Sequence, residues 1–139
     1  MNSAMAWPLN IGGAARLSGV SAKMVRHYES LGLLPAVGRT DSNYRQYSEQ
    51  QVETLRFVKR ARELGFSMVE IAELVGLWHN GRRASASVRR IAQKHAGELA
   101  QRIAAMQAMK RTLDHLIHCC QGDERPDCPI LDDLAGLRP

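Results

Sequence analysis

The chain has 139 residues, of which 45% are hydrophobic and 24% charged, and its formal net charge is +5 at pH 7. This length suits one domain, or a small domain with an extension, around a modest core. No stretch approaches the roughly 18 consecutive apolar residues of a membrane span, and residues 1–8 lack the basic start of a secretory signal. We therefore expect a cytoplasmic protein without a membrane partner, where clustered cysteines more often bind metal or react than form disulfides.

The charges are unevenly distributed along the chain. Residues 10–47 carry five lysines and arginines against two acidic residues, whereas residues 119–139 carry five acidic residues against two arginines. A basic segment suits the negatively charged phosphates of a nucleic acid. We expect the N-terminal segment, and not the C-terminal one, to face nucleic acid.

A helix-turn-helix unit is predicted near the N-terminus. Residues 1–9 lack periodicity and are expected to form a disordered leader. Two short helices are predicted over residues 11–17 and 22–31, with Ser21 as the N-cap of the second helix and Gly32 at its end. Such a pair also occurs in many small helical proteins, so the pattern alone is only moderately specific. The outward-facing residues of the second helix would be Ala22, Lys23, Arg26 and His27.

A small β-wing is predicted to follow these helices. Asp41-Ser42-Asn43 has turn chemistry, and Asn43 tolerates the left-handed conformation that a hairpin tip needs. Ser48 and Ser67 then cap two further helices, the first with Gln51 in a capping box. Residues 10–80 would together form a winged helix-turn-helix domain.

A long helix is predicted from about residue 85 to residue 118. Its apolar residues follow one another by threes, fours or their sums and form one narrow stripe: Val88, Ile91, Leu99, Ile103, Met106, Leu113 and Leu116. So short a chain offers no internal partner for a stripe of this length. A coiled coil with a second copy is therefore favoured over packing on the chain's own domain, and residues 81–118 are expected to be a dimerisation region.

The three cysteines, Cys119, Cys120 and Cys128, all lie within ten residues. Cys120 and Cys128 bracket a seven-residue polar loop, and Pro129 begins a short helix with Cys128 at its N-cap. Two thiols brought together by so short a loop suit a disulfide or a soft metal ion, although the odd cysteine count weakens a purely disulfide interpretation. His115 and His118 could supply nitrogen ligands. Residues 119–139 are thus expected to form a metal-binding loop with a short C-terminal helix.

These motifs together resemble those of MerR-family transcription regulators over about residues 10–135. The segments that carry the resemblance are Ile11 with Ala14–Ser21, Arg26–Glu29, Gly32–Pro35, Arg39 with Tyr44–Tyr47, and Arg62–Ser67 with Glu70-Ile71. The pattern Cys120-x7-Cys128-Pro129-Ile130, with Gly122-Asp123 in the loop, is similar to the copper-efflux regulator (CueR-like) branch. Two departures, His27 in place of Tyr or Phe and Asn43 in place of Gly, put only fine DNA contacts in doubt.

The resemblance implies a mainly α homodimer in which an antiparallel coiled coil joins two winged helix-turn-helix units. It implies an activator that binds double-stranded promoter DNA and distorts its spacer so that RNA polymerase engages both promoter elements. No catalytic constellation is visible, so no enzymatic activity is expected. Most DNA contacts should be to phosphate, although each contact residue could instead be a solvated surface residue. The implied DNA-binding residues are Arg16, Lys23, Arg26, His27, Arg39, Tyr44 and Arg45, among which Arg26 and Arg45 coincide with family motifs.

The resemblance also assigns the metal ligands to Cys120 and Cys128, with Ser85 and Arg89 close to the metal loop of a partner subunit. Branches that sense divalent ions have a third thiolate where this chain has Ser85, and two thiolates alone favour Cu(I), with Ag(I) and Au(I) as similar competitors. One alternative is a divalent ion such as Hg(II) held by Cys119 and Cys128. Another is a redox-responsive regulator in which Cys120 and Cys128 form a reversible pair. Cys119 is otherwise expected to be a free thiol at a helix end, and His95 an ordinary buried residue.

Overall fold

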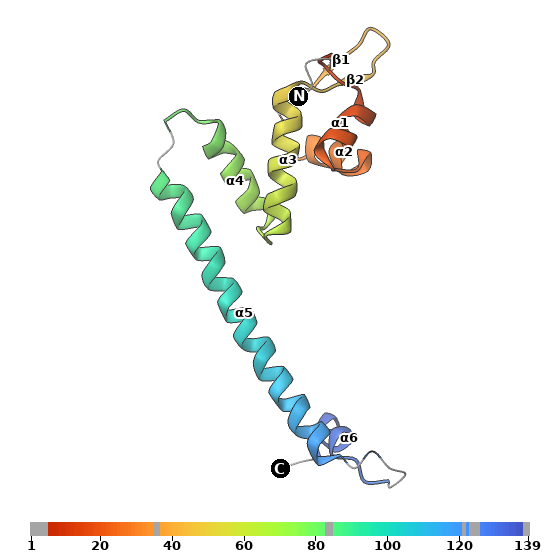
Figure 1. The fold of residues 1–139 in the computed structure, drawn as a ribbon, viewed down its shortest axis with the longest axis vertical. Coiled ribbons are helices and arrows are strands. Elements are labelled where there is room, and N and C mark those ends of the chain that lie inside the picture. Colours follow the sequence, from red (N-terminus) through yellow and green to blue (C-terminus); the bar gives the residue numbers. More distant parts are fainter. Residues whose placement is uncertain (1–5, 35–36, 83–84, 121, 123–125, 138–139) are drawn as a thin grey trace. The chain divides into compact units, whose positions relative to one another are not determined.

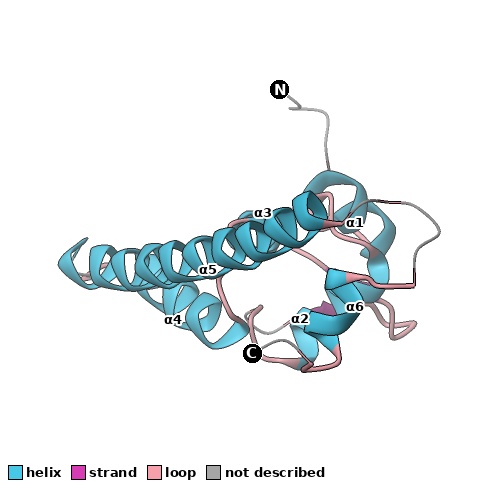
Figure 2. Ribbon diagram, turned by 90° about the horizontal axis from the view of Figure 1, so that it is seen from below, coloured by secondary structure: helices cyan, strands magenta, loops and turns pink. Residues whose placement is uncertain are grey.

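The computed structural model describes residues 6–34, 37–82, 85–120, 122 and 126–137 (Figure 1). Its elements are α1 (Ile11–Ser18), α2 (Ala22–Ser30), β1 (Gly38–Arg39), β2 (Arg45–Gln46), α3 (Glu49–Glu63), α4 (Met68–His79), α5 (Ser85–Cys119) and α6 (Pro129–Leu134). Helices dominate and strands form only a small patch (Figure 2), which confirms the predicted mainly α class. The chain divides into two compact units, Met1–Ile91 and Ala92–Pro139.

Side-chain caps fix the first two helices. The Asn10 side chain accepts a hydrogen bond from the N–H of Gly13 at 2.8 Å, and α1 ends at Gly19, whose φ of 76° is left-handed. The Ser21 hydroxyl then accepts from the N–H of Met24 at 3.2 Å and starts α2. The predicted helix-turn-helix unit is confirmed.

The wing is a short antiparallel hairpin. Strands β1 and β2 pair Gly38 with Gln46 and Arg39 with Arg45, and Asn43 at the tip has a left-handed φ of 68°, as predicted. The expectation of a disordered leader over residues 1–9 is wrong at its end. Leu9 exchanges two backbone hydrogen bonds with Tyr47, at 2.8 and 2.7 Å, because the backbone at Tyr47 extends the hairpin edge and needs partners. Residues 1–5 lie outside the described part of the chain.

Capping boxes begin both α3 and α4. The Ser48 hydroxyl accepts from the Gln51 N–H while the Gln51 side chain accepts from the Ser48 N–H, as the sequence predicted. Ser67 and Glu70 form the equivalent pair at the start of α4.

One hydrophobic core holds the first unit together. The fully buried apolar side chains of α3 are Val52, Leu55 and Val58, which are spaced three residues apart and form the inner face of that helix. Leu31 is 49% exposed because it lies at the C-cap, beyond the last turn of α2. The other large core members are Val25, Tyr28, Leu33, Leu34, Tyr47, Ile71 and Val75.

The long helix α5 ends one residue beyond its predicted end. Among its described residues, only His95 and Leu116 are buried. No helix in the described part of the chain combines the length and the apolar character needed to cross a membrane. Large apolar residues nevertheless remain exposed along α5, at Ile103, Met106, Met109, Leu113 and Ile117. Met109 and Ile117 were not part of the predicted stripe.

Candidate DNA-binding surface and metal centre

The basic residues of the helix-turn-helix unit are exposed. Arg16 lies in the last turn of α1, and Lys23, Arg26 and His27 lie on α2. Lys23 and His27 are four residues apart, so they share one face of the helix. The His27 ring also lies against the Tyr28 ring, with centroids 6.0 Å apart and planes at 48°. These side chains can reach an external anion such as a phosphate.

The tip of the wing presents an arginine and a tyrosine. Nη1 of Arg39 donates a hydrogen bond to the carbonyl oxygen of Asn43 at 3.3 Å, so the guanidinium lies along the hairpin. Tyr44 is 70% exposed, while its backbone N–H donates to the Thr40 hydroxyl at 3.1 Å. Two backbone hydrogen bonds, from the Thr40 N–H to the Tyr44 carbonyl and from the Asn43 N–H to the Thr40 carbonyl, also fix the turn, and the Tyr44 ring is left available for an outside partner.

Arg45 is placed differently from the other predicted DNA-binding residues. Its Nε donates to Oε1 of Glu29 at 2.8 Å, and the two side chains are 33% and 21% exposed. The Tyr47 hydroxyl donates to the same oxygen at 3.2 Å. Burial, together with the neighbouring Glu29 carboxylate, raises the pKa of Tyr47 from 10.0 to about 12. The Tyr47 hydroxyl therefore stays protonated, and a donor, at neutral pH.

No functional role was predicted for Glu29 or for the basic residues of α3. The partners of Glu29 lie 16 and 18 residues further along the chain, so no local pattern announces them. On α3, Arg56 donates through Nε to the Leu17 carbonyl at 3.1 Å, tying α3 to α1. The exposure of Lys59 and Arg60 could have been found from the helical phase of α3, since they follow directly on the buried Val58.

The three cysteines lie at the junction of α5 and α6. Cys119 ends α5, the Cys120 N–H donates to the Ile117 carbonyl at 3.1 Å, and Cys128 is the N-cap of α6. All three are half-buried free thiols. Gly122 has a left-handed φ of 68°, which suits a reversing loop, while residues 121 and 123–125 lie outside the described residues. The donors present, soft thiols half-shielded from water, fit a soft metal ion.

Cys119 has a close neighbour of its own. Its Sγ lies 3.8 Å from Nε2 of His115, one turn earlier on α5. The two residues are four apart, so this contact follows from the helix itself. His118 is exposed.

Ser85 and Arg89 lie at the start of α5, and both are exposed. Cys119 lies at the other end of the same helix, whose 35 residues span about 50 Å at 1.5 Å per residue. One chain therefore does not bring Ser85 and Arg89 together with Cys120 and Cys128.

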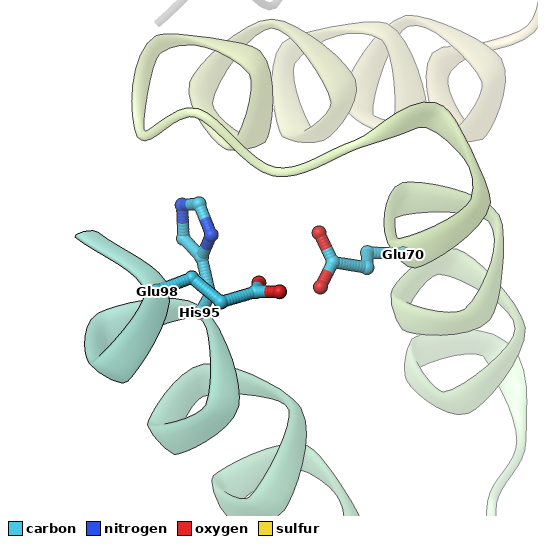
Figure 3. Close-up of side chains that lie close together, drawn as sticks. All are labelled: Glu70, His95 and Glu98. Carbon is cyan, nitrogen blue, oxygen red and sulfur yellow. The ribbon is translucent and has the colours of Figure 1, made fainter. Parts of the chain in front are cut away.

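Two further side chains that could bind a metal ion, those of His95 and Glu98, share one face of α5. His95 is buried and Glu98 half-buried, and their side chains project from adjoining turns (Figure 3). Glu70, drawn in the same figure, accepts a hydrogen bond from the Ser67 N–H at 2.9 Å and so serves the cap of α4. Glu70 belongs to the first compact unit and His95 and Glu98 to the second, so we assign no shared site to them.

Known families and proteins match the chain over most of its length. The family profile "MerR HTH family regulatory protein" matches residues 9–76, and the profile "MerR, DNA binding" matches residues 52–116. The chain is 53% identical over 128 residues to "Heavy metal-dependent transcription regulator 2" of Rhizobium meliloti (strain 1021), covering 92% of this chain and 87% of that protein. It is 36% identical over 128 residues to "HTH-type transcriptional regulator CueR" of Escherichia coli O6:H1, covering 92% and 95% respectively.

A solved structure shares the fold. The transcription regulator PbrR691 from Ralstonia metallidurans CH34, crystallised in complex with lead(II), superposes with a TM-score of 0.81 at 28% sequence identity. The superposition covers 91% of this chain and 98% of that one.

Proposed function

This chain belongs to the MerR family of transcription regulators, and from that premise we propose that it is a metal-responsive activator that binds promoter DNA. The observation that carries the proposal is the pair of half-buried free thiols, Cys120 and Cys128, between the end of α5 and the start of α6. The regulator of Rhizobium meliloti that is 53% identical to this chain is named as heavy metal-dependent, which supports a metal as the signal.

We propose Cu(I) as the inducing ion. Two thiolates provide a low-coordinate soft site, whereas a divalent ion such as Zn(II) usually takes three or four ligands. Ag(I) and Au(I) share this coordination chemistry and would compete for the same thiols. The resemblance to the copper-efflux branch and the 36% identity to CueR point in the same direction.

A divalent ion is the second candidate, and a specific contact favours it. His115 and Cys119 approach within 3.8 Å and could add a nitrogen and a sulfur ligand to the cysteine cluster. PbrR691, which was crystallised with lead(II), is an example of a relative of this fold that holds a divalent ion. A thiol redox response of Cys120 and Cys128 is the third candidate for the same residues.

The working form that we propose is a homodimer in the cytoplasm. Ile103, Met106 and Leu113 are more than half exposed on α5, and water-facing apolar side chains at helical spacing suit a coiled-coil partner. An antiparallel pairing would place Ser85 and Arg89 of the partner subunit beside Cys120 and Cys128. Within one chain, Ser85 and Arg89 do not reach these cysteines, since about 50 Å separates the two ends of α5.

The DNA-binding surface in this proposal combines α1, α2 and the wing. Arg16, Lys23, Arg26 and His27 come from the helices, and Arg39, Tyr44 and Arg45 come from the wing. The cations among these residues, which are exposed except for the half-buried Arg45, would bind mainly phosphate, and binding energy spent on bending the promoter would let RNA polymerase engage it.

Replacement of single cysteines tests the metal assignment. We expect Cys120→Ser and Cys128→Ser each to abolish metal-dependent activation of a promoter reporter, with DNA affinity changed less than about threefold, because the helix-turn-helix unit does not contain these thiols. Cys119→Ser is the matched control and should keep the response. A panel of Cu(I), Ag(I), Au(I), Zn(II), Pb(II) and Hg(II) then selects the inducer. Loss of activation in Cys119→Ser, with Cys120→Ser still active, would overturn the Cys120–Cys128 assignment.

Mass spectrometry separates a metal response from a redox response. The reduced protein should gain the mass of Cu(I) and keep three free thiols when the metal is removed. A loss of two hydrogens without bound metal, accompanied by promoter activation, would favour the redox alternative instead.

A further inference from the structure

Glu29 is an acidic residue next to residues of the surface that we propose for DNA, since it follows His27 on α2 and contacts Arg45. It lies in the last turn of α2, two residues after His27, and is half-buried. A carboxylate at this place repels phosphate and weakens the attraction of Lys23 and Arg26 for DNA. Its presence there calls for a compensating role.

The contacts of Glu29 converge on one oxygen. Its Oε1 accepts from Nε of Arg45 at 2.8 Å and from the hydroxyl of Tyr47 at 3.2 Å. Tyr47 is fully buried and is itself fixed by its two backbone hydrogen bonds to Leu9. The carboxylate is therefore held between α2 and the wing by a donor that cannot move freely.

We propose that Glu29 is a positioning residue that orients the Arg45 guanidinium toward a DNA phosphate, an inference that rests on the proposed DNA-binding function. The ion pair with Glu29 uses Nε of Arg45, and the two Nη nitrogens can donate to another acceptor. A guanidinium held at Nε presents its remaining N–H groups in a fixed plane, which matches the oxygens of a phosphate. Glu29 thereby lowers the entropy that Arg45 loses when DNA binds.

The same contact also joins the recognition helix to the wing. Arg45 belongs to β2 and Glu29 to α2, so the ion pair fixes the position of the wing relative to α2 within the proposed DNA-binding surface. A purely structural brace would affect the stability of the fold, but it would leave the number of phosphate contacts unchanged. Salt dependence therefore distinguishes positioning from bracing.

A double-mutant cycle tests the proposal. The probe is a labelled duplex that the full-length wild-type protein selects from a random-sequence pool, and affinity is measured over a series of salt concentrations. We expect Glu29→Ala to weaken binding about 5- to 10-fold and to reduce the salt slope by about one contact, although it removes a negative charge. Arg45→Ala should have a similar effect, and Glu29→Ala should add nothing in the Arg45→Ala background.

Two further variants control for charge and for the Tyr47 contact. Glu53→Ala removes an exposed carboxylate from α3 and should leave affinity unchanged or slightly higher. Tyr47→Phe removes only the second donor to Glu29, and we expect a loss smaller than that of Glu29→Ala. Thermal unfolding of each variant, carried out without DNA, verifies that the protein bound in the assay is folded.

Each remaining outcome overturns one of the two proposals. Unchanged affinity and slope in Arg45→Ala would remove Arg45 from the proposed DNA-binding surface. A normal loss in Arg45→Ala together with equal or tighter binding in Glu29→Ala would leave the surface in place and overturn the role of Glu29. Equal losses from Glu29→Ala in both backgrounds, or a loss without a change of salt slope, would show that Glu29 does not act through Arg45.

Discussion

The two compact units of this protein differ in how far their large apolar side chains are buried. In the unit Met1–Ile91, Val25, Leu55 and Ile71 are completely buried by other residues of the chain. In the unit Ala92–Pro139, Met106 is 66% exposed and Leu134 74% exposed, and Leu116 is the one large apolar side chain that is buried among the described residues.

The first unit encloses its own core, whereas we propose that the second unit is completed by a partner. The first unit is stabilised by a closed hydrophobic core, so polar and charged residues can occupy its surface. The second unit consists mainly of one helix, and a single helix cannot enclose a hydrophobic core of its own. Its exposed apolar residues indicate a surface completed by another molecule, which we propose is a second copy.

The largest expected effect comes from opening the closed core. Leu55→Ala removes three carbon atoms from a fully buried site on α3, and we expect it to lower the free energy of unfolding by about 2–5 kcal/mol. The comparison variant is Leu134→Ala on α6, where the side chain is 74% exposed and the change should stay within about 0.5 kcal/mol. Urea unfolding followed by circular dichroism measures both. Similar losses would contradict the contrast between the units.

A charge placed on the apolar stripe should break the dimer that we propose. Leu113→Glu puts one carboxylate on each copy at a position that would be desolvated on pairing, and we expect the dimer dissociation constant to rise about 100-fold, or about 3 kcal/mol. Arg102→Glu on an exposed part of the same helix is the charge control and should change it far less. Sedimentation velocity over a range of concentrations gives the constant. A wild-type protein that stays monomeric throughout would remove the dimer from the proposal.

Alkaline pH should weaken the first unit through Tyr47. Its pKa of about 12 in the folded chain exceeds the ordinary value of 10.0, because burial and Glu29 disfavour the phenolate. The folded state therefore holds this proton more tightly than the unfolded state. The resulting stability is complete below pH 10 and is lost as pH rises from 10 to about 12.

The loss from Tyr47 should amount to about 2 kcal/mol, at about 1.4 kcal/mol per pKa unit and with allowance for solvent. Tyr47→Phe removes the titrating group, so the difference in unfolding free energy between wild type and variant should shrink over that pH interval. A difference that stays constant from pH 9 to 12 would show that the phenol titrates alike in both states.

The smallest effect contrasts the helix caps of the two units. Ser48→Ala removes a hydroxyl that accepts from the Gln51 N–H, and we expect a loss of about 1 kcal/mol. Cys128 occupies the same cap position on α6 without a side-chain hydrogen bond, so Cys128→Ala should cost less than about 0.3 kcal/mol in metal-free protein. Equal losses in thermal unfolding would show that the thiol contributes to the cap.

Local chemistry allowed much of the fold to be predicted. Ser21, Ser48 and Ser67 each begin a helix because a side-chain oxygen satisfies a backbone N–H of the first turn, and this interaction spans only three residues. The left-handed Asn43 at the wing tip and the extent of α5 followed from equally local signals. The approach of His115 to Cys119 is of the same kind, since one helical turn joins them.

The tertiary structure decided what distant residues do to one another. The sequence placed Arg45 among the DNA-binding candidates, but only the fold brings it to Glu29, 16 residues away, and brings the Tyr47 hydroxyl to the same Glu29 oxygen. The pairing of Leu9 with Tyr47 was likewise missed, because hydrogen bonds between separated backbone segments leave no periodic trace in either segment. The hydrogen bonds of caps and turns join residues only a few positions apart, so a short stretch of sequence is enough to predict them. The contacts that orient Arg45 depend on how α2, β2 and the segment at Leu9 close around one core.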